Sequence, residues 1–196
     1  MSVALTQQEL YCQWFTPPTV AEEFLAWCRI RPDDVLLEPA AGEGALVPEG
    51  HRQVVAFEVD PDRCAELRER RPLANVVCAD FLAQPPPAAH VADVAVLNPP
   101  YSDDGEGTFV LRSLLWAPRA CALVRLEALH GSNRHKSCWQ HVQLTRIAFL
   151  VHRPRFLGLF GARTPHHPKY SYVAVEARCS DGADFSYPET SWVQWR

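Results

Sequence analysis

Three short apolar segments in the first half of the chain each end in an acidic residue, and this pattern constrains the fold more than any other. Each segment has the length and apolar content of a buried strand. A strand that ends in an acid and runs into a Gly-x-Gly turn is typical of the opening of a nucleotide-binding unit. The sequence therefore predicts an α/β protein. The segments are 34–38, 53–58 and 75–80, which end in Glu38, Glu58 and Asp80.

The remaining periodic segments predict helices and strands along the whole chain. Apolar residues at helical spacing predict a helix over 19–29, with Thr16 as its N-cap and prolines in its first turn. Further helices are expected over 61–70 and 109–117. The 196 residues are expected to form a single domain, 1–196. Seven strands are expected, over 34–38, 53–58, 75–79, 91–97, 119–126, 145–152 and 171–177.

Charge is distributed unevenly along the chain. Residues 1–110 contain 7 Lys+Arg and 18 Asp+Glu, a net charge of −11, whereas residues 111–196 contain 12 and 5, a net charge of +7. Ten of the basic residues and six of the eight histidines lie in 112–169, where Glu127 is the single acid. Such a segment suits a surface that binds a polyanion such as a nucleic acid. An ordinary solvated basic face is the alternative.

Cysteine usage and the N-terminus indicate the compartment. The seven cysteines form no Cys-x-x-Cys pair and no Cys/His zinc spacing, so we expect reduced, mostly buried thiols and no metal. No segment approaches the roughly 18 uninterrupted apolar residues of a membrane span. Residues 1–9 lack the basic start and apolar run of a secretory signal. We therefore expect a cytoplasmic protein with no membrane partner.

The turn after the first of these strands contains Gly42 and Gly44. Glycines at these positions let the backbone turn tightly and approach a ligand without a Cβ in the way. Val47 replaces the third glycine of the dinucleotide-binding fingerprint, which argues against a pyrophosphate ligand. Pro48 and Gly50 leave little room for a long helix after the turn.

The acids at the strand ends suit a nucleoside ligand. Glu58 is well placed to accept hydrogen bonds from both hydroxyl groups of a ribose. Asp80 can accept a hydrogen bond from an adenine amino group, while the ring of Phe81 packs against the base. A surface carboxylate for Glu58 and a helix cap for Asp80 are the alternatives. The occurrence of three such acids favours the nucleoside interpretation.

The tetrapeptide Asn98-Pro99-Pro100-Tyr101 follows the fourth predicted strand. It brings an amide, two rigid prolines and an aromatic ring to the end of a buried strand. Asn-Pro is also a common start of a turn, so the tetrapeptide alone does not decide the function. An acidic, Gly-containing loop over 102–107 comes next.

Together these motifs resemble those of class I S-adenosylmethionine-dependent methyltransferases that act on exocyclic amino groups. The individual motifs are weakly specific, but their combination, in the family's order and near its spacing across residues 11–125, is specific. The Thr-Pro-Pro start and the Glu-Pro-Ala-Ala-Gly-Glu-Gly turn look most like the DNA adenine-N6 methyltransferases, including small phage-type versions. The matching segments are 15–18, 37–44, 57–60, 79–81 and 98–101.

The resemblance implies a Rossmann-like, doubly wound, mostly parallel seven-stranded sheet. It also implies S-adenosyl-L-methionine as cofactor and S-adenosylhomocysteine as product. Residues 15–17 would wall the methionine end of the cofactor, and the glycine turn would line its main-chain pocket. The cofactor-binding residues implied in this way are Phe15, Thr16, Pro17, Glu38, Pro39, Ala40, Gly42, Gly44, Glu58, Asp80, Phe81 and Asn98.

The resemblance further implies that the tetrapeptide catalyses methylation of adenine N6 in DNA. The side-chain oxygen of Asn98 and the carbonyl oxygen of Pro99 would accept both protons of the target amino group, which aims the nitrogen lone pair at the methyl group. Tyr101 would stack on a flipped-out base. No general base of shifted pKa is needed before transfer. The implied catalytic residues are Asn98, Pro99, Pro100 and Tyr101.

Three features depart from the family pattern. No separate target-recognition domain follows the core, so the basic segments of about 127–143 and 153–170 are the expected substrate-recognition elements. The acids of the 102–107 loop, Asp103, Asp104 and Glu106, fit poorly beside a polyanion, which indicates either a mobile lid or a substrate other than a long duplex. The helix expected after Gly44 is short.

Other substrates and a non-catalytic role stay open from the sequence. The same tetrapeptide would handle an RNA base or the amide of a protein glutamine. A cofactor-binding or nucleic-acid-binding protein without catalysis is a further alternative. A purely structural turn, however, has no need of the Asn98 amide.

Overall fold

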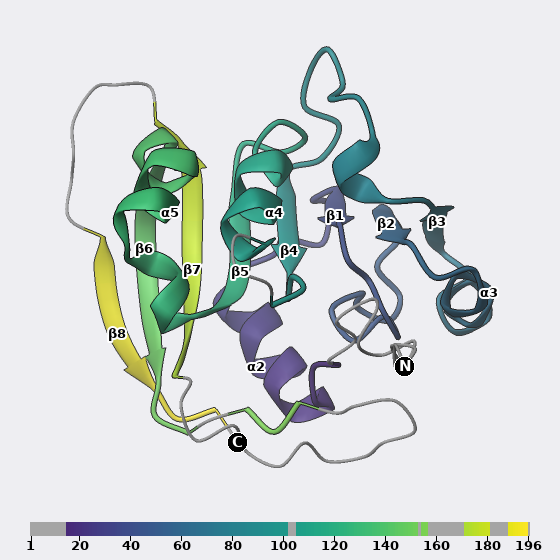
Figure 1. Cartoon of the computed structure of the whole chain (residues 1–196). Helices are drawn as coiled ribbons and strands as arrows, with labels where there is room; N and C mark the ends of the chain where they lie inside the picture. The colour runs from purple at the N-terminus through teal and green to yellow at the C-terminus, as the bar shows by residue number, and fades with distance from the viewer. Residues whose placement is uncertain (1–14, 102–104, 153, 157–170, 181–187, 196) are drawn as a thin grey trace, which may run out of the picture.

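The computed structural model describes residues 15–101, 105–152, 154–156, 171–180 and 188–195 of the chain (Figure 1). Eight strands form one sheet in the order β3-β2-β1-β4-β5-β7-β6-β8. The strands are β1 (Leu36–Glu38), β2 (Val54–Glu58), β3 (Ala74–Cys78), β4 (Val94–Leu97), β5 (Ala120–Arg125), β6 (Val142–Leu150), β7 (Tyr172–Cys179) and β8 (Glu189–Val193). The helices are α2 (Pro18–Trp27), α3 (Pro61–Arg70), α4 (Gly105–Ser113) and α5 (Ser132–Ser137), and the 3-10 turns are η1 (Phe81–Ala83), η2 (Leu126–Leu129) and η3 (Trp139–His141).

The sheet is mostly parallel. The five strands β3, β2, β1, β4 and β5 run parallel to one another. β7 is antiparallel to both β5 and β6. The strand order reverses between β1 and β4, the point at which open α/β sheets bind ligands beyond the carboxyl ends of their strands. The predicted Rossmann-like, doubly wound sheet is therefore confirmed.

The eighth strand is the one that the sequence analysis missed. β8 pairs in parallel with β6 at the edge of the sheet, and most of its residues are exposed or half-buried. Such a strand carries no apolar run, because neither of its faces lies in the core. Trp192, 75% exposed, stacks on Phe149 of β6 with ring centroids 5.1 Å apart.

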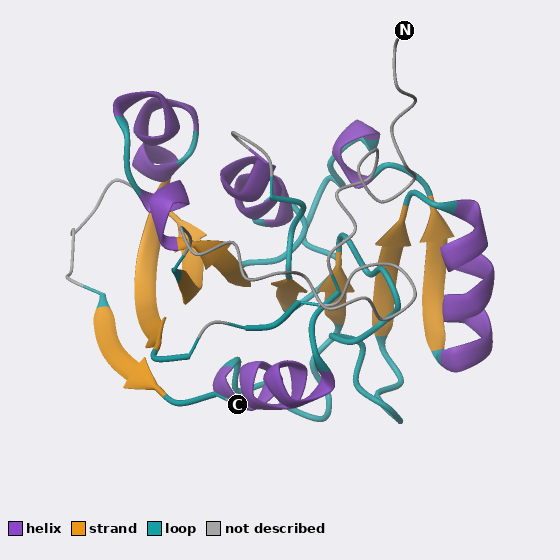
Figure 2. Cartoon of the chain, turned by 60° about the horizontal axis from the view of Figure 1, so that its bottom comes forward, coloured by secondary structure: helices purple, strands orange, loops and turns teal. Residues whose placement is uncertain are grey.

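Helices cover both faces of the sheet (Figure 2). Two apolar cores lie between the layers. One core joins the sheet to α2 and α3, where Phe24 and Leu67 are fully buried. The other joins it to η1, α4 and η3 through Phe81, Phe109 and Trp139. The near-continuous apolar sequence of β4 and β5 follows from this burial on both faces.

Helix α3 forms where the sequence predicted it, because its start signals are local. The carboxylate of Asp60 accepts hydrogen bonds from the backbone amides of Asp62 and Arg63, and Pro61 occupies the first turn. Helix α4 differs from the prediction, since it begins at Gly105 rather than near Phe109 and ends at Ser113. Among the described residues no helix is long and apolar enough to cross a membrane.

Candidate active site

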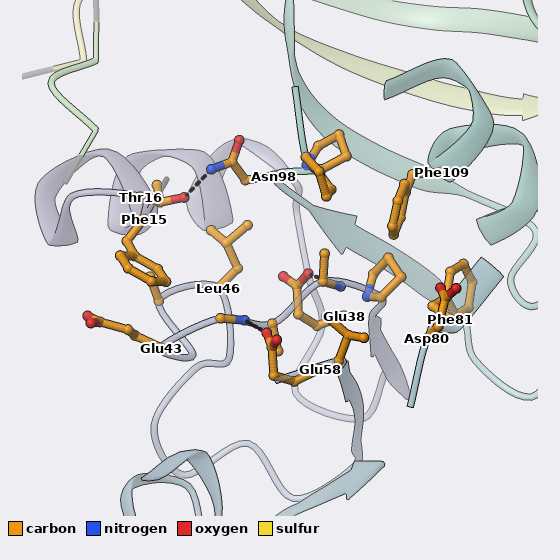
Figure 3. Close-up of a pocket in the computed structure, with 18 of the residues that line it drawn as sticks. Phe15, Thr16, Glu38, Glu43, Leu46, Glu58, Asp80, Phe81, Asn98 and Phe109 are labelled. Carbon is orange, nitrogen blue, oxygen red and sulfur yellow. Dashed lines mark hydrogen bonds between the residues drawn. The ribbon is translucent and has the colours of Figure 1, made fainter. Parts of the chain in front are cut away.

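A cavity of about 320 Å³ opens at the carboxyl edge of the parallel strands, where the strand order reverses. Figure 3 shows residues from four strand ends and from the segment before α2 around it. A volume of this size is in the range of small-molecule sites. All predicted site residues except Pro17 and Gly44 line it. Those present are Phe15, Thr16, Glu38, Pro39, Ala40, Gly42, Glu58, Asp80, Phe81, Asn98, Pro99, Pro100 and Tyr101.

Glu38 is a buried carboxyl group at the end of β1. Its Oε1 accepts a hydrogen bond from the backbone amide of Ala40 at 3.1 Å. Burial, with a smaller contribution from the charge of the neighbouring Glu58, raises the pKa of Glu38 to about 8. A cation bound beside this group would favour its ionised form.

Glu58 holds the glycine turn in place. Its Oε2 accepts a hydrogen bond from the amide of Gly42 at 2.7 Å, and its Oε1 accepts one from the amide of Asp60 at 2.9 Å. Burial raises the pKa of this carboxyl group as well. Glu58 is therefore not a free surface carboxylate, because one oxygen braces the turn that lines the cavity and the other bonds the residue that caps α3.

A side chain at Gly42 and one at Gly44 would meet different neighbours. Both adopt positive φ, 52° at Gly42 and 78° at Gly44, so the predicted tight turn is confirmed. A Cβ on Gly42 would lie 3.1 Å from the Phe15 ring at the cavity wall. A Cβ on Gly44 would lie 2.4 Å from Cδ1 of Leu67. The lack of a Cβ at Gly44 is thus required by helix α3, Gly44 is not among the residues that line the cavity, and its approach to a ligand stays a prediction.

The segment before α2 closes one side of the cavity. Phe15 and Thr16 are buried, and the guanidinium of Arg63 lies 4.9 Å from the centroid of the Phe15 ring. The prediction of Thr16 as the N-cap of α2 is wrong, because Pro17 occupies that position without a side-chain cap bond. The hydroxyl of Thr16 instead accepts a hydrogen bond from Nδ2 of Asn98 at 3.0 Å (Figure 3).

Asn98 is held at both ends of its side-chain amide. Nδ2 donates to Thr16, and Oδ1 accepts a hydrogen bond from the hydroxyl of Tyr101. The Tyr101 ring lies 5.5 Å from each of the rings of Phe156 and Tyr172. Burial raises the pKa of Tyr101 well above its usual range, so the hydroxyl stays protonated and able to donate.

Asp80 and Phe81 follow β3, and Asp80 both caps the 3-10 turn η1 and lines the cavity. Oδ1 of Asp80 accepts a hydrogen bond from the amide of Leu82 at 2.9 Å, so the capping alternative is realised at η1 while the residue also lines the cavity. Phe81 is buried between the rings of Phe57 and Phe109, with centroids 5.2 and 6.0 Å away. Its ring is mainly part of the core.

Eight further lining residues were not predicted. Phe109 comes from α4, where the apolar helix spacing identified it as core and gave no sign of its place on the cavity wall. The others lie within a few positions of a predicted residue and could have been found by extending each strand end in both directions. The eight are Ala41, Glu43, Ala45, Leu46, Val59, Ala79, Leu82 and Phe109.

The charges near the cavity differ from the prediction. Glu106 does not belong to an exposed acidic loop, because it lies in the first turn of α4, is 1% exposed and forms an ion pair with Arg125. Asp103 and Asp104 lie outside the described residues. Arg119 and Arg146 pair with the buried Glu176. Three arginines of the basic segment 112–169 are therefore neutralised inside the protein and are not available to bind phosphates.

Exposed basic groups are nevertheless present on the predicted recognition segment 127–143. Its helix α5 has no buried residue, and His135 and Lys136 are exposed. Of the second segment, 153–170, only residues 154–156 are described. Six free cysteines occur among the described residues, four of them buried. The described part of the chain holds no group of three or more His, Cys, Asp or Glu side chains that could bind a metal ion.

Comparison with known sequences gives partial relatives. No family model matches the chain. It is 30% identical over 177 residues to the dimethyladenosine transferase of Candida glabrata, covering 82% of this chain and 54% of that protein. It is 46% identical over 65 residues to the rRNA adenine N-6-methyltransferase of Saccharopolyspora erythraea, covering 30% and 17%. The chain thus spans about half the length of the dimethyladenosine transferases that it matches.

Comparison with solved structures decides the fold. A protein of Listeria monocytogenes assigned to the class I S-adenosylmethionine-dependent methyltransferases superposes with a TM-score of 0.65, at 13% identity over 98% of this chain and 67% of that one. The fold is that of the class I methyltransferases. The structure of the 23S rRNA methyltransferase ErmE superposes with a TM-score of 0.58, at 23% identity over 86% and 70%. A protein of Pyrococcus horikoshii assigned as an RNA methyltransferase gives 0.63, at 18% identity over 86% and 87%.

The class I fold accounts for the position of the cavity. In this fold the switch point between β1 and β4 is where the sheet edge is open to a ligand, and the predicted site residues converge there. Of the two curated relatives named above, one is by name a dimethyladenosine transferase and the other an rRNA adenine N-6-methyltransferase.

Proposed function

We propose that the protein is an S-adenosylmethionine-dependent methyltransferase that acts on N6 of an adenine in RNA. The observation that carries the proposal is the convergence of Glu38, Glu58 and Asp80 with the Asn98–Tyr101 tetrapeptide on one cavity of the class I fold. The partial relatives support adenine as the target and RNA as its carrier. Because the chain spans about half of the dimethyladenosine transferases, its own substrate has to be measured.

The residues around the cavity fit the proposed cofactor. When bound, S-adenosylmethionine supplies a methyl group activated by a sulfonium, and the protein orients it. Glu38, buried and with a raised pKa, suits the ammonium group of the methionine end, because a cation offsets the cost of ionising a buried carboxyl group. Glu58 would accept from the ribose with its remaining lone pairs, and Asp80 from the adenine amino group.

Asn98 and Pro99 would activate the target nitrogen. The lone pair of an adenine amino group is delocalised into the ring, so the nitrogen is a poor nucleophile. If Oδ1 of Asn98 and the carbonyl oxygen of Pro99 accept hydrogen bonds from its two N–H groups, the nitrogen becomes more pyramidal and its lone pair points at the methyl group. After methyl transfer the nitrogen releases one proton to water. Oδ1 of Asn98 has two lone pairs, so it can accept from the target while it accepts from Tyr101.

Substrate contact is proposed through the surface beside this edge. Segment 127–143 follows β5 at the carboxyl edge of the parallel strands and carries the exposed His135 and Lys136. Basic groups there would contact phosphates without reading sequence. Tyr101 lines the cavity and would contact the face of the target base.

A partition experiment tests the proposed function. The protein is incubated with S-adenosylmethionine carrying a labelled methyl group and with RNA, single-stranded DNA, duplex DNA or a protein mixture, each at equal concentration. We expect label in RNA at least tenfold above the other substrates. Label mainly in DNA would restore the first prediction, and label mainly in protein would point to a glutamine amide. Cofactor binding without transfer to any of them would support a non-catalytic role.

A further inference from the structure

A buried ion pair lies next to the ring of Tyr101 without lining the cavity. Nε and Nη2 of Arg125, at the end of β5, donate to Oε1 and Oε2 of Glu106 at 2.6 and 2.9 Å. Glu106 is 1% exposed and the Arg125 side chain 13%. Neither residue is among those that line the cavity. A buried pair of this kind contributes little net stability compared with apolar residues of similar size. Its effect on the neighbouring groups is therefore of more interest than its effect on stability.

Arg125 connects this pair to the tetrapeptide. Its guanidinium carbon lies 5.7 Å from the centroid of the Tyr101 ring, within the range of a cation–π contact. Phe156 and Tyr172 contact the same ring from other directions, each with its centroid 5.5 Å away. The Tyr101 ring is thus confined by one cation and two aromatic rings.

The chain of contacts continues to the amide. The Tyr101 hydroxyl donates to Oδ1 of Asn98, and Nδ2 of Asn98 donates to the hydroxyl of Thr16. The orientation of the amide therefore depends on where the Tyr101 hydroxyl is held. An error of about 1 Å in the position of such a group can reduce a rate on the order of a hundredfold.

We propose that Glu106 and Arg125 are positioning residues that fix Tyr101 and, through its hydroxyl, the side-chain oxygen of Asn98. Neither lines the cavity in which the cofactor and the target base are proposed to bind. The kinetic consequence rests on the proposed function, but the structural one does not. If the ion pair is broken, Tyr101 gains freedom and the Asn98 amide loses its fixed orientation.

A second ion pair provides a matched control. Arg146 pairs with Glu176 at 3.0 Å, and its guanidinium lies 4.1 Å from the centroid of the Trp27 ring. The exposed fractions of the two side chains, 11% and 6%, are close to those of the Glu106 pair. None of these three residues lines the cavity. Substitutions of Arg146 should therefore cost stability without affecting the amide.

The first test uses no activity. The side-chain NH2 signals of Asn98 are assigned in a ¹⁵N-labelled protein by comparison with Asn98→Ala. We expect Arg125→Met and Glu106→Gln to shift these signals and accelerate their exchange with water, Arg125→Lys to do so less, and Arg146→Met to leave them unchanged. Unchanged Asn98 signals in the folded Arg125→Met and Glu106→Gln variants would overturn the proposal. If Arg125→Met does not fold, Arg125→Lys and Glu106→Gln decide it in the same way.

The second test uses turnover on the substrate found in the partition experiment. We expect Arg125→Lys to lower kcat at least tenfold while the Kd of the cofactor changes less than threefold. The same substitution in a Tyr101→Phe background should lower kcat less than twofold, because the hydroxyl through which Arg125 acts is already absent. Equal losses in both backgrounds would contradict the proposal. Absence of turnover in the wild type would instead refute the proposed function, and the Asn98 signals would still decide the positioning role.

Discussion

Asn98 and Thr16, 82 positions apart in the chain, are joined by a hydrogen bond from Nδ2 of the amide to Oγ1 of the hydroxyl at 3.0 Å. This bond ties the end of β4 to the segment before α2, so the proposed catalytic group and one wall of the cavity form a single unit. It also leaves Oδ1 of Asn98 as the end of the amide that meets Tyr101 and, in the proposed reaction, the target amino group.

Removing the hydroxyl of Thr16 tests this relationship. In Thr16→Val the Nδ2 group of Asn98 loses an acceptor worth about 1 kcal/mol, so we expect kcat to fall about fivefold and the cofactor Kd to change less. Thr16→Ser keeps the hydroxyl and should retain most of the activity. Steady-state kinetics and calorimetric cofactor titration measure both quantities. Equal effects of valine and serine would show that the hydroxyl is not the relevant group.

Substitutions of Glu58 and Asn98 should affect cofactor binding and methyl transfer separately. Glu58→Ala leaves the backbone amides of Gly42 and Asp60 without acceptors, at about 1–3 kcal/mol for each, so we expect a lower free energy of unfolding and weaker cofactor binding. Asn98→Ala should abolish transfer while the cofactor Kd stays within about threefold, since a lost orientation acts on the chemical step. Denaturant unfolding and calorimetry check the pair. The division of roles fails if Asn98→Ala weakens cofactor binding as much as Glu58→Ala does.

The pKa of Glu38 predicts a pH dependence of stability. The folded value is about 8 and the ordinary value 4.5, so between these the folded protein holds a proton that the unfolded chain has released. The contribution of Glu38 to stability is therefore greatest below pH 4.5, falls as the pH rises towards 8 and is constant above it. Glu38→Gln does not titrate, so its stability relative to the wild type should increase across this window by a few kcal/mol. Urea unfolding at pH 5, 7 and 9 measures the difference; a constant difference would contradict the raised pKa.

Alanine substitutions of Gly44 and Gly50 distinguish the cost of a strained backbone from the cost of a steric clash. Both have positive φ, 78° and 76°, but a Cβ on Gly44 would meet Leu67 at 2.4 Å, whereas a Cβ on Gly50 would find nothing within 4 Å. Gly50→Ala should cost about 1–2 kcal/mol of unfolding free energy, from the left-handed backbone alone. Gly44→Ala should cost about 1–3 kcal/mol more, from overpacking against α3. Equal losses would show that Leu67 can move aside.

Much of the fold was predictable because its signals are local. The cap and proline that start α3, and the apolar runs of β4 and β5, depend on neighbours in sequence and on burial. β8 gave no such signal, because an edge strand is held by backbone pairing with β6 and buries little. The early start of α4 was hidden by Gly105 and Gly107, which disfavour a helix.

The candidate site was predictable as a set of residues but not as a set of contacts. The strand-end acids and the tetrapeptide could be placed at one edge, because parallel strands bring their carboxyl ends together. The residues next to Thr16 and Gly44 could not be predicted, because Asn98 and Leu67 are distant in sequence and come close only in the folded structure. The ion pair of Glu106 was missed for the same reason. The sequence pattern indicates which residues line the site, and only the packing shows which residue each of them contacts.

The most direct test of the central claim is the identity of the methylated atom. Wild-type protein and Asn98→Ala are incubated with RNA and S-adenosylmethionine carrying a deuterated methyl group, and the RNA is digested to nucleosides for mass spectrometry. We predict deuterated N6-methyladenosine from the wild type, and none from Asn98→Ala although it still binds the cofactor. A methyl group on another atom, or the same product from both proteins, would contradict the proposed role of the Asn98–Tyr101 site.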